Sequence, residues 1–249
     1  MMTMPDAWLP VTLAFLAGGV VKGAVGLGLP TVVLAALAPY MPVSKAAAIL
    51  VIPSLVTNAW QMFGGPRAAQ SAWRLAPLLA GIVVGTLAAP IGMATVNTHV
   101  AALCLGVLLL SYAAIGLANL TLSMPPAAEP WVSPVLGLVS GVINAATGLF
   151  VMPLVPYLQS LEMEKDELVQ ALALCFTVGA LALALRLWMD GTSVLGEATA
   201  SALALAAALL GMPAGKALRD RSSQRIFRKC FFATLLVVGG GLTAKALTG

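Results

Sequence analysis

Eight apolar runs, most of them about 20 residues long, dominate the sequence and limit what it can fold into. Short polar or proline-containing breaks separate the runs, and Asp and Glu lie in these breaks or near run ends. A helix of about 20 residues spans the roughly 30 Å hydrocarbon core of a bilayer. The sequence therefore predicts an all-α polytopic membrane protein. The runs cover residues 8–38, 44–63, 75–93, 96–120, 131–158, 168–189, 194–215 and 226–247.

The composition excludes several other classes of protein. Apolar residues make up 60% of the chain and charged residues 9%, whereas soluble domains average about 45–50% and about 25%. This excludes most soluble folds and a disordered chain. The net charge of +4 is too small to expect nucleic-acid binding. A β-barrel would need short alternating segments, which runs such as residues 202–211 lack.

The chain carries no motif of catalysis or ATP use. It contains no HExxH, no GxSxG and no phosphate-loop sequence, and its three cysteines stand apart inside apolar runs. The first eight residues contain no Lys or Arg, so we expect no cleaved signal peptide. We expect neither an enzyme nor a metal or other cofactor. Transport by this chain would draw on a substrate or ion gradient.

The two halves of the chain resemble each other. Residues 19–27 align with residues 141–149 at an offset of 122, and weaker matches follow at offsets of 123 and 126. Internal duplication is common among transporters. A proline-rich stretch lies between the halves and lacks helical periodicity. We therefore predict a first membrane repeat over residues 1–120, a linker over 121–130 and a second repeat over 131–249.

The first run of each half contains a break. Residues 8–38 would form an unbroken helix of about 46 Å, which exceeds the hydrocarbon core. Glycine and proline weaken a helix, so we expect a break between Gly26 and Pro30. The fifth run has a similar weak point from Asn144 to Gly148. Broken segments at matching positions of two halves indicate a transport site.

Two topologies fit these runs. Either every run crosses the membrane once, or the first and fifth runs are re-entrant hairpins and the halves are inverted repeats. Both place the basic stretch 216–229 in the cytoplasm by the positive-inside rule. The length and central break of the first run favour the hairpins and inverted repeats, because unwound backbone at membrane depth must line a cavity or be buried in protein.

Lys22 is a charge near the middle of the first run. A lysine at that depth costs about 2.5–3.5 kcal/mol on insertion scales and marks a functional site by default. Because no run carries a carboxylate near its middle, we interpret Lys22 as an unpaired cation that binds an anionic ligand. The alternative is a structural lysine that reaches the interface or lines a wet vestibule.

Other polar residues lie at helical spacing on the second run or near the break of the fifth. They either bind the anion through neutral donors or join helices, and Asn144 aligns with Lys22. The glycine pairs Gly81/Gly85 and Gly211/Gly215 are interpreted as packing faces. The predicted substrate-binding residues are Lys22, Gly23, Gly26, Gly28, Ser54, Thr57, Asn58, Gln61, Asn144, Thr147, Gly148 and Thr177.

The glycine pattern resembles that of a known family. Gly19-xxx-Gly23-xx-Gly26-x-Gly28 precedes Pro30, and the second half has Gly137-xxx-Gly141-xx-Asn144-xx-Thr147-Gly148-Leu-Phe-Val-Met-Pro153. With the two four-run halves, this layout is similar to the TauE/SafE sulfite exporter family, also called the toluene-sulfonate uptake permease family. The resemblance covers residues 8–247. Where the family often has three consecutive glycines, this chain has Gly26-Leu-Gly28.

The resemblance implies a secondary transporter of sulfite, organosulfonates or related sulfur-containing and carboxylate anions in the bacterial inner membrane. Rocking of one half against the other would give alternating access to a site at the broken helices. An anion channel and a non-transporting membrane scaffold are the alternatives. The expected partners are a small anionic substrate and the lipid bilayer, and a homodimer is left open.

Overall fold

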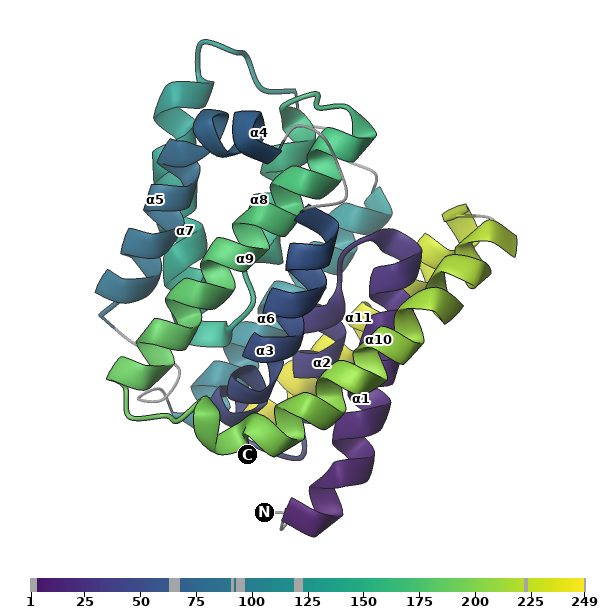
Figure 1. The fold of residues 1–249 in the computed structure, drawn as a ribbon. Helices are drawn as coiled ribbons and strands as arrows, with labels where there is room; N and C mark the ends of the chain where they lie inside the picture. The colour runs from purple at the N-terminus through teal and green to yellow at the C-terminus, as the bar shows by residue number, and fades with distance from the viewer. Residues whose placement is uncertain are drawn as a thin grey trace.

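The computed structural model of the chain describes residues 4–62, 68–90, 92, 97–118, 123–221 and 224–248, and these form a bundle of helices (Figure 1). The predicted all-α fold is confirmed for this part of the chain. The helices are α1 (Met4–Val25), α2 (Leu29–Leu37), α3 (Val43–Met62), α4 (Ala68–Arg74), α5 (Ala76–Ala88), α6 (Thr98–Ala118), α7 (Glu129–Thr147), α8 (Val151–Ser160), α9 (Lys165–Met189), the 3₁₀ helix η1 (Leu195–Glu197), α10 (Ala198–Arg221) and α11 (Gln224–Thr248).

Six of these helices are long and apolar enough to cross a membrane. They correspond to α1, α3, α6, α7, α9 and η1 with α10, while α5 and residues 231–247 of α11 form shorter apolar helices. Large apolar side chains remain exposed on their outer faces, for example Leu13 and Leu181. An exposed apolar surface of this kind suits contact with lipid, so the predicted membrane protein agrees with the fold.

Helix α5 covers only part of the apolar run 75–93. It ends at Ala88, and Ala89 adopts φ −54° and ψ 129°. The next residue is Pro90, and a residue before proline is driven from helical to extended backbone. Arg186 of α9 donates from Nη1 to the carbonyl oxygens of Leu87 (3.0 Å) and Ala89 (2.8 Å). The end of α5 is therefore held by a neighbouring helix.

The first helix of each half ends at a glycine in the left-handed conformation. Gly26 has φ +86° and donates its N–H to the Lys22 carbonyl at 2.7 Å. Gly148 has φ +69° and donates to the Asn144 carbonyl at 2.8 Å. Glycine adopts this conformation without the penalty that a Cβ atom brings. The chain then starts the short helices α2 and α8, so Lys22 and Asn144 occupy equivalent positions.

Glycines let α1 lie against α10 and α5 lie against α7. A Cβ atom at Gly211 or Gly215 of α10 would clash with the α1 backbone, and one at Gly81 or Gly85 of α5 would clash with the α7 backbone. The predicted packing role of these two glycine pairs is confirmed. In both helix pairs the contacts advance in the same chain direction, so each pair is parallel. Each pair also joins one helix from each half.

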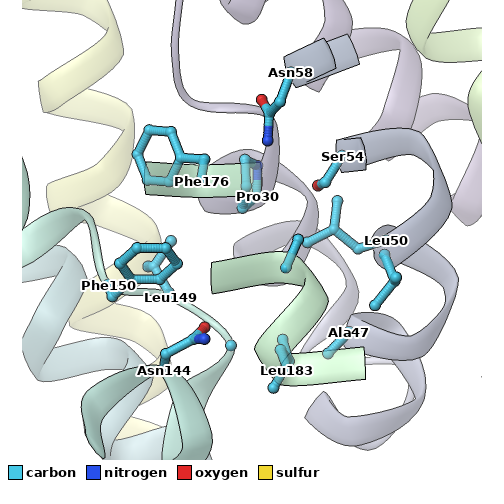
Figure 2. A pocket seen from close by; sticks show the side chains of 13 residues that line it. Pro30, Ala47, Leu50, Ser54, Asn58, Asn144, Leu149, Phe150, Phe176 and Leu183 are labelled. Carbon is cyan, nitrogen blue, oxygen red and sulfur yellow. The ribbon is translucent and has the colours of Figure 1, made fainter. Parts of the chain in front are cut away.

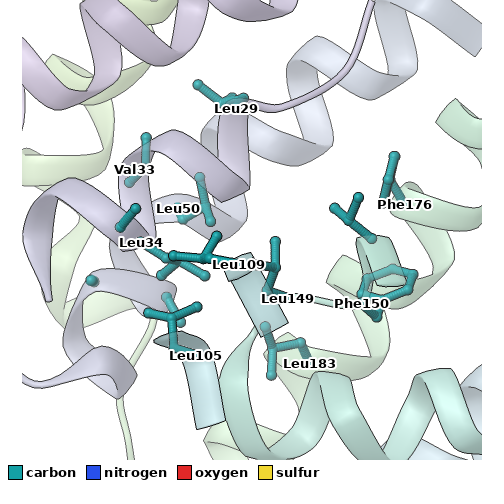
Figure 3. Packing of buried hydrophobic residues seen from close by; sticks show 14 of the residues in the cluster. Leu29, Val33, Leu34, Leu50, Leu105, Leu109, Leu149, Phe150, Phe176 and Leu183 are labelled. Atoms are coloured by element: carbon teal, nitrogen blue, oxygen red, sulfur yellow. The ribbon is translucent and has the colours of Figure 1, made fainter. Parts of the chain in front are cut away.

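Helices α3 and α9 lie side by side in the middle of the bundle, where α2 and α8 also begin (Figure 1). Helix α6 packs antiparallel to α11, with Gly106 against Gly239 and Thr243. The buried core joins α6 to the two short helices and α9 through leucine and phenylalanine side chains (Figure 3). The core therefore surrounds the point where both first helices break. Examples are Leu29, Leu34, Leu105, Leu109, Leu149, Phe150 and Leu183.

Candidate functional site

A buried cavity of about 30 Å³ lies between the two helix breaks (Figure 2). Helices α3 and α9 form its sides, the start of α2 closes one end, and the link from α7 to α8 closes another. A volume of this size holds two or three water molecules, or a ligand of a few heavy atoms. The lining residues are Pro30, Ala47, Leu50, Val51, Ser54, Asn58, Asn144, Gly148, Leu149, Phe150, Phe176, Ala180 and Leu183.

Three polar atoms of the lining have no hydrogen-bond partner in the protein. They are the Ser54 hydroxyl, the Asn58 side-chain nitrogen and the Asn144 side-chain oxygen. The three residues are 4%, 3% and 1% exposed. A buried polar group without a partner costs about 1–3 kcal/mol, and most buried polar groups in proteins are paired. Three such atoms on one small cavity indicate a binding site for a polar ligand.

The neighbours of the two amides fix which atom each presents to the cavity. Asn58 accepts a hydrogen bond from Lys22 Nζ, and an ammonium group can only donate. The Asn58 oxygen therefore faces Lys22 and its nitrogen is free. Asn144 donates from Nδ2 to the Gly179 carbonyl (3.0 Å) and to Thr86 Oγ1 (3.3 Å). Since a carbonyl can only accept, the free atom of Asn144 is its oxygen.

Lys22 lies behind Asn58 and does not line the cavity. It is 3% exposed, and it also donates to Thr57 Oγ1 at 2.9 Å. The prediction of a buried lysine is confirmed, and its partners Thr57 and Asn58 carry no charge that would pair with it. Its two partners are neutral oxygens, which accept two of the three ammonium hydrogens and do not cancel the charge. The positive charge of Lys22 therefore acts on the cavity through Asn58.

Several predicted residues hold the breaks in place and do not line the cavity. Gln61 donates to the Gly26 carbonyl at 2.7 Å. Thr147 donates to the Ile143 carbonyl at 2.8 Å and accepts the Leu149 N–H at 3.2 Å. These contacts connect the unwound backbone to neighbouring helices. Four predicted residues line the cavity itself, namely Ser54, Asn58, Asn144 and Gly148.

The last three predicted residues have other local roles. Gly23 lies against the backbone of Met212 in α10, so it is a packing glycine. Gly28, at φ +108°, precedes the first residue of α2. Thr177 donates to the Ala173 carbonyl at 2.7 Å within its own helix. None of these three lines the cavity between the breaks.

Comparison with known proteins decides the family of this chain. Residues 11–242 match the family described as sulfite exporter TauE/SafE, which is nearly the whole chain. The chain belongs to the TauE/SafE family. The family resemblance predicted from the glycine pattern is thus confirmed. No curated protein and no solved structure matches the chain.

Membership of the TauE/SafE family gives the fold a general function. The family is one of membrane transporters named for sulfite export, and the six long apolar helices fit an integral membrane protein. The small buried cavity lies inside the matched residues, between the two breaks. We therefore take it as the candidate site of this TauE/SafE protein.

Sequence reasoning missed most of the apolar lining of the site. Leu149 and Phe150 follow the left-handed Gly148 directly, so their place beside a break could have been noticed. Phe176 contacts Phe150 edge to face, with ring centroids 5.3 Å apart. Nothing in the sequence indicates that contact. The same holds for Thr86, which bonds to Asn144 from a helix of the other half.

Another cavity, of about 420 Å³, lies at the end of the bundle near the loop between α2 and α3. Tyr40, His99 and Lys245 contribute to its lining. No atom of its lining is among the unpartnered buried polar atoms of the described residues. The larger cavity therefore lacks the feature that marks the smaller one.

Proposed function

We propose that this TauE/SafE protein is a secondary transporter of small sulfur-containing anions, with sulfite and organosulfonates as the first candidates, and that the substrate binds in the cavity between the helix breaks. The observation that carries the proposal is the convergence of three unpartnered polar atoms, from Ser54, Asn58 and Asn144, on that cavity. The family of membrane transporters supplies the activity, and the cavity supplies a place for it.

Electrostatics near the cavity favour an anion. Helix α2 begins beside it, since Pro30 belongs to its lining, whereas the continuous helix of α8 starts only after the non-helical Met152. The N-terminus of a helix carries a partial positive charge and free N–H groups. Lys22 holds its amino group behind Asn58 and adds a positive charge there when protonated. These groups can stabilise a small anion without a cation in direct contact.

The helix pairs support inverted repeats with the first and fifth runs as hairpins. Helices α1 and α7 end at equivalent left-handed glycines, and α2 and α8 turn back along them (Figure 1). The pair α1–α10 corresponds to the pair α7–α5, and α3–α9 and α6–α11 each join equivalent helices. Helices α1 and α7 run in opposite directions along the bundle (Figure 1). The repeats are residues 1–120 and 131–249, joined by the linker 121–130.

In this proposal, two groups of helices move relative to each other during alternating access. These groups are not the two halves of the sequence. Helices α1, α3 and α10 pack together, as do α5, α7 and α9. Each of these bundles contains helices from both repeats. The cavity lies where α3 of one bundle faces α9 of the other. Rocking of one bundle against the other would open the cavity to each side in turn.

The proposed setting is the inner membrane of a bacterium, with the basic stretch 216–229 in the cytoplasm. Lys216 and Lys229 are exposed, and the side chains of residues 219–228 lie outside those described. The positive-inside rule supports this orientation. Homodimerisation stays a prediction.

Counterflow of radiolabelled sulfite in proteoliposomes tests the proposal. Purified protein preloaded with unlabelled sulfite is expected to accumulate label in a saturable way, and organosulfonates and small carboxylates are added as competitors. In Asn58→Leu, which removes the free donor, exchange is expected to fall at least about tenfold, since a lost hydrogen bond to a charged ligand costs about 1.5–3 kcal/mol. Lys22→Met is expected to lose exchange similarly, because Asn58 loses the group that orients it.

A matched control is Ser140→Ala. Ser140 is buried on α7 and its hydroxyl is unpartnered, but it does not line the cavity. Exchange by this variant is expected to match the parent protein. Steady conductance without saturation or counterflow would favour a channel over a carrier. Folded protein that neither exchanges nor is stabilised by any of these anions would overturn the proposal and favour a scaffold.

A further inference from the structure

The three free atoms in the cavity differ in their hydrogen-bonding character. The Asn58 nitrogen can only donate and the Asn144 oxygen can only accept, while the Ser54 hydroxyl can do either. A fully deprotonated oxyanion offers acceptors only. It would satisfy Asn58 and Ser54, and it would leave the Asn144 oxygen facing a negative charge.

We infer that the cavity selects an oxyanion that carries its own acidic proton, hydrogensulfite in the case of sulfite, over the dianion and over sulfonates. This rests on the proposed function and names the protonation state of its substrate. The O–H of such a monoanion donates to Asn144, and its other oxygens accept from Asn58 and Ser54. All three free atoms are then paired.

The Asn144 oxygen is held in place by its partners. Its amide nitrogen donates to the Gly179 carbonyl on α9 and to Thr86 on α5. Turning the amide over would put two oxygens against each other at Gly179. The acceptor therefore stays directed to the cavity whichever ligand enters, and it acts as a specificity-determining group.

The charged groups near the cavity favour a ligand that carries a single negative charge. Lys22 is the one cation bonded to a lining residue among the described residues, through Asn58. None of the lining side chains can titrate. Among the side chains that the structure describes on the helices around the cavity, the other ionisable groups are engaged or apart from the lining: Lys45 with Glu197, Arg74 with Glu129 and Glu167, Arg186 with Asp190, Tyr157 with Ser133, and Cys175 buried.

Selection of the protonated form has a consequence for coupling. Each turnover that moves hydrogensulfite also moves one proton, carried by the substrate. The protein then needs no carboxylate or histidine at membrane depth as a proton relay. An outward proton gradient and an outward sulfite gradient would act together on the same species.

The test measures binding of sulfite and of methanesulfonate to the purified intact protein as a function of pH. The range runs from about one pH unit below to about two units above the pKa of hydrogensulfite. Above that pKa the apparent Kd for total sulfite is expected to rise about tenfold per pH unit, as the protonated fraction falls. Methanesulfonate has no such proton, so its binding is expected to be weak and independent of pH.

The outcomes separate this inference from the proposed function. Saturable sulfite exchange with an apparent Kd that does not change across the range would overturn the inference and leave the transporter intact. A parallel loss of methanesulfonate binding with pH would also overturn it, because a protein group such as Lys22 would then be titrating. Absence of sulfite exchange by folded protein at every pH would overturn the proposed function itself.

A variant adds a second readout. Asn144→Leu removes the acceptor, and the preference for hydrogensulfite over methanesulfonate is expected to shrink at least tenfold. Ser140→Ala, on the same helix and equally buried, is expected to keep the preference. An unchanged preference in folded Asn144→Leu would contradict the role of Asn144. If Asn144→Leu does not fold, the pH comparison on the parent protein still decides the question.

Discussion

Lys22 and Asn144 lie at matching positions of the two halves of the chain and differ in chemistry. Each accepts the N–H of a left-handed glycine four residues later and donates its side chain to the next long helix, α3 or α9. Lys22 turns the donor of Asn58 to the cavity, whereas Asn144 presents its own acceptor. A basic residue in the first half and a neutral one in the second thus give the cavity a donor on one side and an acceptor on the other.

Gly26→Ala tests the break at the level of a single residue. Its φ of +86° costs a residue with a Cβ atom about 1–2 kcal/mol. The space itself is open, because the nearest atoms would lie 3.9 Å from the new Cβ. We expect the free energy of unfolding in detergent to fall by about that amount. The measurement is a denaturant or SDS titration of the purified protein.

The matched control for this variant is Gly240→Ala. Gly240 lies inside α11 with nothing within 4 Å of an added Cβ. Alanine favours a helix over glycine by up to about 1 kcal/mol, so this variant is expected to be as stable as the parent or slightly more so. Equal stability of Gly26→Ala and the parent would contradict a backbone role for Gly26.

For single residues, the sequence predicted where the helix break and the buried lysine lie better than it predicted which residues they contact. Glycine and proline chemistry placed the first break between Gly26 and Pro30, and helix α1 ends one residue before that range. The burial of Lys22 also followed from the sequence. Its bonds to Thr57 and Asn58 did not, because the register of α3 against α1 depends on how side chains of both helices pack. That register alone decides that Asn58 stands between Lys22 and the cavity.

The long helices are assembled in pairs by small residues. Close approach of two helix backbones gives extensive van der Waals contact, which drives helix association in membranes where no hydrophobic effect separates protein from lipid. In the pairs α1–α10 and α5–α7 this contact occurs at glycines on both helices. Each pair is therefore sensitive to the size of a few side chains.

Gly85→Leu tests this packing. A side chain at this position would collide with the Leu138 carbonyl of α7, and rigid backbone cannot move aside as a flexible side chain does. We expect a loss of more than about 3 kcal/mol or failure to fold, since overpacking costs about 1–3 kcal/mol even where side chains can adjust. The readout is the yield of monodisperse protein after gel filtration in detergent.

Gly240→Leu is the control for the larger side chain, because an added Cβ there meets nothing within 4 Å. It is expected to give the parental yield. If Gly85→Leu gave the same yield, the close packing of α5 on α7 would not be needed for the fold.

At the scale of elements, the sequence predicted the glycine faces and left their partners open. A pair such as Gly211 and Gly215 indicates that some backbone comes close, without indicating which one. The length of α5 was also missed, because the apolar run continues past Pro90 although the helix ends at Ala88. An apolar run shows which residues can lie in lipid or in the protein core. The end of the helix depends on the backbone, here on the proline at position 90.

Ion pairs join neighbouring elements near both ends of the molecule. At one end Arg74 forms two hydrogen bonds of 2.8 Å to Glu129 and lies 3.9 Å from Glu167 at the start of α9. At the start of α3, Lys45 lies 3.6 Å from Glu197. The bond to Glu129 raises the pKa of Arg74 above its ordinary value, so this cation stays charged at any physiological pH.

Orientation in the membrane is tested by labelling single cysteines. Helices α10 and α11 run in opposite directions, so Lys216 and Lys245 lie toward opposite ends of the bundle (Figure 1). In protein whose own cysteines are replaced by alanine, Lys216→Cys is expected to react with an impermeant maleimide only in inside-out vesicles. Lys245→Cys is expected to react only in intact spheroplasts. The reverse pattern would contradict the proposed orientation.

The pairs α1–α10 and α5–α7, each of which joins helices from both halves of the chain, also bear on how the protein is synthesised. When the first repeat leaves the ribosome, the glycine face of α1 has no partner, because α10 has not yet been synthesised. The glycine face of α1 can therefore be covered by α10 only after most of the chain has been translated. If the two halves were encoded by separate genes, we expect that both would have to be expressed together, because the glycine faces of each half pack on helices of the other.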